Sequence, residues 1–342
     1  MLQVTNDPDS QEPVPRSPTP PWPGRLVSLP NGQLFLRSAP AVTVPGAEPA
    51  EPALFIHGLG GSSTNWTDLM DLLSRPSDAH LVAPVLDCTA VDLPGFGFSP
   101  PAADGRYTIS AHAEAVARLI EQQGNGPVHL ISNSMGGAVG TRLAARRPDL
   151  VRSLVLISPA LPDLRPRPLP LRLAVATVPA VGPRLMEWLR KQPAESRTDH
   201  TISDLFNDPA LFHPLRRDAE IAEVLRRDGL PYANIALVLS ARSLVLEYFK
   251  VGRSSLWHDA TTVRAPVLIL HGSHDRLVNP VMAGKAARAF RGGRVLVLSG
   301  VGHVAMMERP AVVAREIRSF LDWVRVRGAR PASTGRRPTG RT

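Results

Sequence analysis

The chain has 342 residues, of which 43% are hydrophobic, and this size and composition are typical of a globular protein with a sizeable buried core. The formal net charge is +9 at pH 7, but no nucleic-acid motif accompanies it, which argues against a nucleic-acid-binding function. The basic charge leaves weak contact with an anionic membrane surface as an alternative. The single cysteine, Cys88, excludes a disulfide within the chain, and we expect it to be a packing residue just before a strand.

Both ends of the chain are predicted to be disordered. Residues 1–24 are rich in proline and contain no hydrophobic stretch of the kind that a signal peptide needs. Residues 327–342 form a basic tail of arginine among glycine, serine, threonine and proline. Since there is no signal peptide and no unbroken apolar segment long enough to span a membrane, the pattern predicts a cytoplasmic protein.

Between these ends, short runs of apolar and β-branched residues alternate with helix-compatible segments. This alternation predicts an α/β fold, a mostly parallel eight-stranded sheet with helices on both faces. We expect this core to comprise residues 25–158 and 264–326. The predicted strands are Arg25–Leu29, Gln33–Ser38, Ala53–His57, Thr89–Asp92, Val128–Ser132, Leu154–Ile157, Val267–His271 and Arg294–Leu298.

A glycine-rich turn follows the predicted strand Ala53–His57. Residues 58–61 read Gly-Leu-Gly-Gly, and such a turn can present a free backbone N–H group to a developing negative charge. Leu59 is the best candidate for this donor. A phosphate-binding role is excluded, because no Gly-Lys-Ser/Thr follows and no G-x-G-x-x-G opens a helix.

Ser134 follows the predicted strand Val128–Ser132 and precedes a helix-compatible segment, Ala138–Arg147. Strand, sharp turn and helix are the context in which a serine hydroxyl is exposed on a strained elbow. The expected pattern G-x-S-x-G is here Ser-x-Ser-x-Gly, since Ser132 replaces the first glycine. Met135, the residue after the candidate nucleophile, is the second candidate oxyanion donor. The alternative interpretation is a turn of small residues without chemistry.

The α/β alternation stops between residues 159 and 263, which are predicted to form a helical cap inserted between two strands. The aliphatic residues of this segment indicate a pocket for an apolar acyl or alcohol group. Three arginines could contact an anionic headgroup, although solvation at the surface is favoured for each: Arg167, Arg172 and Arg184. The predicted amphipathic helices are Ile202–Phe212, Ala219–Arg227 and Tyr232–Phe249.

A serine nucleophile needs a base, and the base needs an orienting acid. Asp275 and His303 each lie just past the carboxyl end of a late predicted strand, where open α/β sheets place their sites. His303 follows Gly-x-Gly on a loop, so we expect it to be the base and Asp275 to be the acid. Asp163 is the alternative acid, but its proline and leucine neighbours favour a linker.

The other nine histidines are predicted to have structural roles. His57 and His271 end strands before glycine, and we expect both rings to make structural hydrogen bonds. His274 is expected at the surface or beside the acid. The remaining six show no metal-ligand spacing, so we expect no metal and no cofactor. They are His80, His112, His129, His200, His213 and His258.

Five motifs follow one another along the chain: His57–Gly61, Asp92–Ser99, Ser132–Gly137, Gly272–Asp275 and Gly302–His303. By these motifs the chain resembles, from about Arg25 to Val326, the α/β-hydrolase superfamily, in its serine-nucleophile branch with a helical cap. The resemblance implies that Ser134 is the nucleophile, Asp275 the orienting acid and His303 the base. A serine at the elbow argues against the branches with an aspartate nucleophile, such as epoxide hydrolases and haloalkane dehalogenases.

The predicted function is hydrolysis of a carboxylic ester with an apolar part. A C–C bond hydrolase is a second candidate, since the elbow Asn133–Gly137 looks like that of meta-cleavage-product hydrolases. Those enzymes usually carry tryptophan after the histidine, where this chain has Val304, and the difference argues against the C–C branch. An acyltransferase or perhydrolase with the same catalytic residues is a third candidate, and a non-catalytic binding protein on the same scaffold is a fourth.

Overall fold

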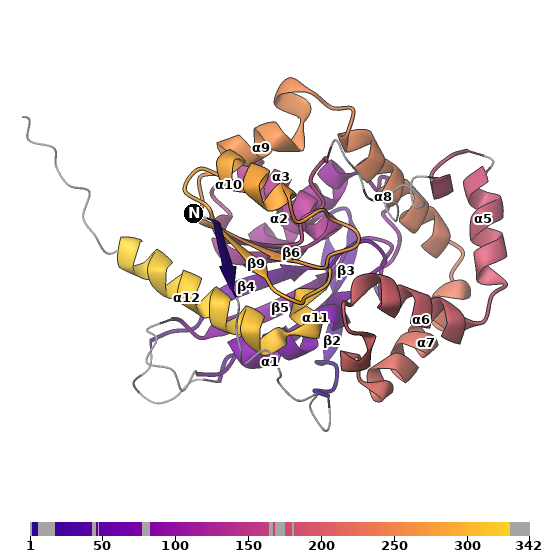
Figure 1. Ribbon diagram of the computed structural model, residues 1–342, viewed down its shortest axis with the longest axis horizontal. Coiled ribbons are helices and arrows are strands. Elements are labelled where there is room, and N and C mark those ends of the chain that lie inside the picture. Colours follow the sequence, from indigo (N-terminus) through magenta and orange to yellow (C-terminus); the bar gives the residue numbers. More distant parts are fainter. Residues whose placement is uncertain are drawn as a thin grey trace, which may run out of the picture.

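The computed structural model describes residues 2–5, 18–42, 46, 48–76, 83–163, 167, 175–179 and 181–328. One nine-stranded sheet, in the order β1-β9-β8-β7-β6-β4-β5-β3-β2, runs through the molecule, with helices on both faces (Figure 1). β2 and β3 are antiparallel to their neighbours, and the other pairs are parallel. The predicted fold class is therefore confirmed.

The strands are β1 (Leu2–Thr5), β2 (Gly24–Leu29), β3 (Gly32–Ala39), β4 (Glu51–Ile56), β5 (Leu86–Asp92), β6 (Val128–Asn133), β7 (Val151–Ile157), β8 (Val267–Gly272) and β9 (Arg294–Leu298). The helices of the core are α1 (Thr67–Leu73), α2 (Ile109–Gln123), α3 (Met135–Arg146), α10 (Met282–Ala289), α11 (Ala305–Glu308) and α12 (Pro310–Gly328).

All eight predicted strands are present, and several are longer than predicted. Cys88 was expected just before a strand but lies within β5, where it is fully buried. The ninth strand, β1, is a correction, because it lies in the stretch predicted to be disordered and pairs with β9. The surrounding prolines hid its short strand-forming sequence. Residues 6–17 and 329–342 lie outside the described part of the chain, so the predicted disorder is untested there.

Two buried apolar layers hold the sheet, one on each face. One layer packs α2, α3, α9 (Leu256–Thr262) and α10 against the strands, and the other packs α1, α11 and α12. The central strands β6 and β8 are buried at every position, which accounts for their continuous apolar sequences. The two faces therefore support the carboxyl ends of the parallel strands, where the candidate residues lie.

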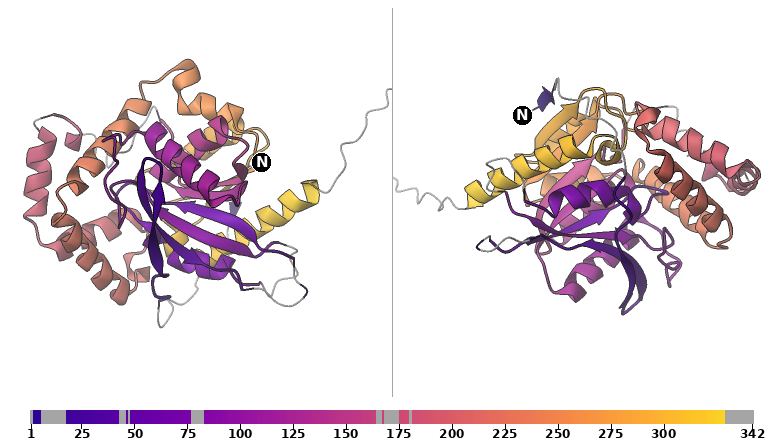
Figure 2. Two further views of the ribbon diagram at one scale, coloured as in Figure 1. Left: turned by 180° about the vertical axis from the view of Figure 1, so that it is seen from behind. Right: turned by 90° about the horizontal axis from the view of Figure 1, so that it is seen from below.

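The segment between β7 and β8 forms a helical layer beyond the sheet (Figure 2), apart from its last helix, α9, which packs against the sheet. The predicted helix Ile202–Phe212 is wrong in its bounds: α6 ends at Leu205, and a short 3-10 turn, η2, follows at Pro209. Proline disfavours helical backbone in the residue before it, so the helix cannot continue through Asp208. The helices here are α5 (Val181–Arg190), α6 (Ala194–Leu205), α7 (Pro214–Asp228), α8 (Ala233–Glu247) and α9.

Within the described ranges, no single helix is both long and apolar enough to cross a bilayer. The bent pair α7 and α8 passes the same test by length and composition only. Of the three arginines considered for an anionic headgroup, Arg184 is exposed on α5, Arg167 is half-buried, and Arg172 lies outside the described residues.

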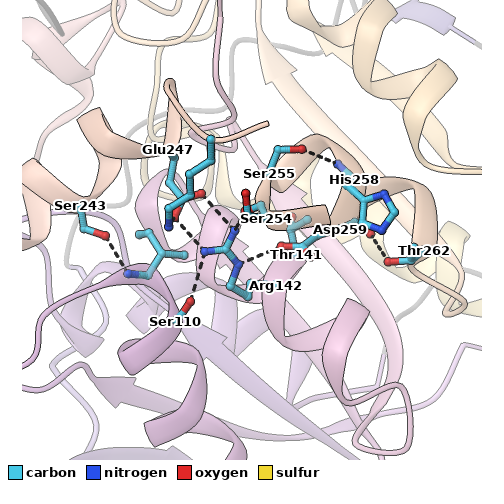
Figure 3. A network of polar contacts seen from close by, with 12 residues as sticks. Ser110, Thr141, Arg142, Ser243, Glu247, Ser254, Ser255, His258, Asp259 and Thr262 are labelled. Carbon is cyan, nitrogen blue, oxygen red and sulfur yellow. Dashed lines mark hydrogen bonds and ion pairs between the residues drawn. The ribbon is translucent and has the colours of Figure 1, made fainter. Parts of the chain in front are cut away.

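A buried network of charges joins this helical layer to the core (Figure 3). Arg142 of α3 is 1% exposed and pairs with Glu247 of α8 and Asp259 of α9, each across 2.8 Å. It also donates to Ser110 Oγ and to the carbonyl of Ser254. Since each of its nitrogens has a partner, the charge is compensated, and the network fixes the end of the helical layer against α3.

Arg142→Met should lower the free energy of unfolding by about 3 kcal/mol, because it leaves the buried carboxylate of Asp259 without its ion pair and that of Glu247 with Lys250 alone. The measurement is equilibrium denaturation with urea. The matched control is Arg147→Met at the end of the same helix, whose ion pairs with Glu121 and Asp149 are exposed to solvent. The control substitution should lower the free energy of unfolding by less than about 1 kcal/mol. Equal losses in both variants would contradict the role of the network.

Candidate active site

Ser134 lies at the turn between β6 and α3, with φ 52° and ψ −118°. A residue with a side chain rarely adopts this conformation, so the surrounding structure must hold it in place. Its N–H donates to the Ile157 carbonyl at 3.1 Å, and its carbonyl accepts from Gly137 and Ala160 at 2.9 Å. The predicted strand, sharp turn and helix are therefore present, and the half-buried side chain of Ser134 lies at their junction.

The elbow depends on glycines because backbone segments approach it closely. A Cβ atom at Gly136 would collide with the carbonyl oxygens of Ile56 and His57 in the strand beside it. A Cβ atom at Gly58 would lie 3.0 Å from Cβ of Ser134. The turn after β4 therefore lies directly against the candidate nucleophile.

Asp275 and His303 form a buried pair. Nδ1 of His303 lies 2.9 Å from Oδ2 of Asp275. An ionised carboxylate only accepts, so Nδ1 carries the proton and Nε2 is left free to act as a base. Burial alone raises the pKa of Asp275, but the charge and hydrogen bond of His303 and the N–H of Val278 more than offset it and hold the pKa below its usual value.

The loop that carries His303 is held against the elbow. The side-chain amide of Asn133 donates to the carbonyl of His303 at 3.3 Å and to that of Ile157 at 3.0 Å. Because Asn133 immediately precedes Ser134, this contact places the loop of His303 beside the elbow. The contact to Nδ1 is made by Asp275. Asn133 had no predicted role.

The two candidate oxyanion donors belong to segments that adjoin Ser134. Leu59 belongs to the turn after β4, which is closed by a hydrogen bond from Gly61 N–H to the Gly58 carbonyl at 3.1 Å. Met135 is the first residue of α3, and the first N–H groups of a helix have no acceptor within it. Both residues therefore remain candidates for the backbone donors that an oxyanion site requires.

Helices α7 and α8 lie over these glycine turns. Arg227 donates to the Gly60 carbonyl at 2.8 Å, and Arg226 donates to the Gly97 carbonyl at 2.6 Å. Leu237 of α8 lies 3.6 Å from the position of a Cβ at Gly60. The charged contacts of α7 had not been predicted, because the sequence does not show which carbonyl a cap arginine reaches.

Among the described histidines outside the pair, one differs from expectation, and His80 lies outside the described residues. His57 makes the expected structural hydrogen bonds, to the Gly58 carbonyl at 2.7 Å and from Leu93 N–H at 3.0 Å. His271 does not: neither ring nitrogen has a hydrogen-bond partner, and burial lowers its pKa to about 4. His274 is exposed beside Ser273, as expected. No group of three metal-ligating side chains occurs among the residues that the structure describes.

Residues 52–310 match the family model of the α/β hydrolase fold, so the chain belongs to the α/β hydrolase family and is an enzyme. It is 31% identical over 278 residues to Lipase LipV of Mycobacterium tuberculosis, across 80% of this chain and 95% of that protein. It is 30% identical over 262 residues to the dihydrolipoyllysine-residue acetyltransferase component of the acetoin cleaving system of Cupriavidus necator, across 76% of this chain. That match spans only 60% of the longer protein.

Among solved structures, a meta-cleavage product hydrolase (CumD) superposes with a TM-score of 0.68. The match covers 88% of this chain and 98% of that chain. At 16% sequence identity, this likeness shows a shared fold.

The free energy of unfolding should fall as the pH decreases from about 6.5 to about 4. Burial lowers the pKa of His271 to about 4 and that of His112 to about 3, from 6.5 in both cases. In this range the unfolded chain binds protons that the folded chain does not, which favours unfolding by up to about 1.4 kcal/mol per pH unit for each histidine. Urea denaturation at several pH values should show that the free energy of unfolding depends less steeply on pH in His271→Leu than in the wild type. His274→Leu changes an exposed ring and should leave this dependence unchanged. Identical slopes in all three proteins would contradict this assignment.

Proposed function

We propose that this protein is a serine hydrolase that cleaves a carboxylic ester through an acyl-enzyme intermediate. The observation that carries the proposal is the strained elbow at Ser134 beside the buried Asp275–His303 pair. A serine hydroxyl needs a base to become a nucleophile, and a neutral imidazole held through Nδ1 supplies one. The names of the curated relatives, which include a lipase and an esterase, support the same reaction class.

In this mechanism Nε2 of His303 takes the proton of Ser134 as its oxygen attacks the ester carbonyl. The N–H groups of Leu59 and Met135 stabilise the oxyanion, and Asp275 stabilises the imidazolium. His303 then gives the proton to the leaving alcohol, which leaves Ser134 acylated. A water molecule then attacks the acyl group on Ser134 in the same way and releases the acid. Apart from the ester and this water, each step uses only side chains and backbone groups of the chain itself.

An apolar acyl or alcohol group is the proposed substrate part that lies under the helical cap. Aliphatic residues of α8 lie over the turn after β4, with Leu237 nearest to Gly60. The same face carries Arg227, whose charge is engaged with the Gly60 carbonyl and with Glu220. Two of the relatives are a monoacylglycerol lipase and a probable lysophospholipase, which supports esters with long apolar chains.

Ser134→Ala should lower the turnover number by about 10⁴-fold or more, because the members of such a triad act as a unit. A fluorophosphonate probe should label the wild type at Ser134 and leave this variant unlabelled. The matched control is Ser132→Gly in the same elbow. The Ser132 hydroxyl is buried without a hydrogen-bond partner, so its loss should preserve labelling and turnover. Labelling of Ser134→Ala at another serine would overturn the assignment.

The ratio kcat/KM should rise with acyl chain length for p-nitrophenyl esters from acetate to dodecanoate. Each buried methylene contributes about 0.8 kcal/mol, or roughly a fourfold gain per carbon, until the pocket ends. A profile that falls from acetate onward would exclude a pocket for a long apolar chain. Activity on a vinylogous diketone with none on any ester would instead assign C–C hydrolysis, and product analysis with added alcohol would reveal acyl transfer.

A further inference from the structure

The turn between α6 and η2, residues Phe206–Asp208, lies against the loop that carries the base, residues Ser299–Val304. The N–H of His303 donates to the carbonyl of Leu205 at 2.7 Å, and the side-chain amide of Asn207 donates to the Gly300 carbonyl at 3.0 Å. A Cβ atom at Gly302 would lie 2.6 Å from the backbone nitrogen of Asn207. The two segments therefore approach so closely that only glycine fits between them.

One buried carboxylate joins these two segments. Glu308 of α11 is 4% exposed, and its Oε2 accepts from Gly302 N–H at 2.7 Å and from Asn207 N–H at 3.3 Å. Its Oε1 accepts from Asp208 N–H at 3.1 Å. Three backbone donors, two of them in the helical cap and one beside His303, thus share a single side chain. Of the three, the Gly302 N–H would be left buried and unsatisfied without this acceptor.

Apolar contacts and the acid loop reinforce the same junction. Phe206 is 3% exposed and belongs to the buried cluster that contains Val301 and Val304 of the histidine loop. Arg276, which follows Asp275, donates to the carbonyl of Ser203 near the end of α6. The end of α6 and the turn after it therefore contact the loops of both the acid and the base.

The backbone of His303 is consequently held from two sides. The core holds its carbonyl through Asn133, and the cap holds its N–H through Leu205. Glu308 holds the preceding N–H, that of Gly302, together with the cap turn. We propose that Glu308 is a positioning residue, whose carboxylate joins the cap to the histidine loop and thereby sets the orientation of the His303 ring. This inference rests on the proposed role of His303 as the base.

The test is Glu308→Gln in the full chain. Glutamine keeps the shape but offers one acceptor oxygen, so its NH₂ group must face one of the backbone donors. We expect the turnover number and the rate of fluorophosphonate labelling of Ser134 to fall by about 10- to 100-fold, because a small displacement of a catalytic group has effects of that size. KM should stay within about threefold, since the substrate contacts are unchanged.

Glu247→Gln is the matched control for a purely structural role. Glu247 is also a buried glutamate that joins the cap to the core, but its partner is Arg142 of α3 and not the loop of His303. The control should lose stability in urea denaturation while the folded protein keeps the wild-type labelling rate. Equal effects of the two variants on labelling would overturn the inference.

Asn207→Ala is the second variant, and it decides the question if Glu308→Gln does not fold. It removes only the side-chain amide that bonds to the Gly300 carbonyl, so we expect labelling to slow, but by less than in Glu308→Gln. Where both variants fold, their effects on labelling should be less than additive, because both act on one junction. A reactive wild type with unaffected Glu308→Gln and Asn207→Ala variants would overturn this inference alone. A wild type that does not react with the probe would overturn the proposed function as well.

Discussion

The left-handed backbone of Ser134 is the constraint on which the rest of the site depends. A positive φ at a residue with a side chain costs about 1–3 kcal/mol, and here it is maintained by hydrogen bonds to β7 and to the start of α3. The conformation reverses the chain so sharply that the start of α3 lies against the end of β4. At this point only a glycine, Gly136, fits beside the carbonyl oxygens of Ile56 and His57. The turn after β4 and the loop that carries His303 both lie next to this elbow, through Gly58 and Asn133 respectively.

The helical segment between β7 and β8 is joined to the core by buried polar contacts at two separated places. Arg142 holds the end of α8 and the start of α9 against the elbow helix, and Glu308 holds the turn after α6 against the histidine loop. Polar groups buried in this way are costly when any partner moves, so these junctions resist displacement.

Much of the fold could be predicted because the central strands are buried on both faces and appear in the sequence as continuous apolar runs. The positions of Ser134, Asp275 and His303 could be predicted because each follows the carboxyl end of such a strand. The roles of Glu308 and Arg142 could not, since Asn207 and Glu247, their partners between β7 and β8, lie about 100 residues away and no local pattern marks them. His271 was misjudged for a related reason: its position in a buried strand was clear, but the absence of an acceptor around its ring was not.

Strand β1 has a consequence for how the protein behaves at high concentration. It pairs in parallel with β9 from Leu2↔Val295 to Thr5↔Leu298, and β9 has the sequence Arg-Val-Leu-Val-Leu. Without β1, this apolar strand would form the open edge of the sheet and present unpaired N–H and C=O groups to other chains. The first few residues therefore shield the sheet from edge-to-edge association, and their proteolytic removal would favour aggregation even though they lie far from the elbow in the strand order.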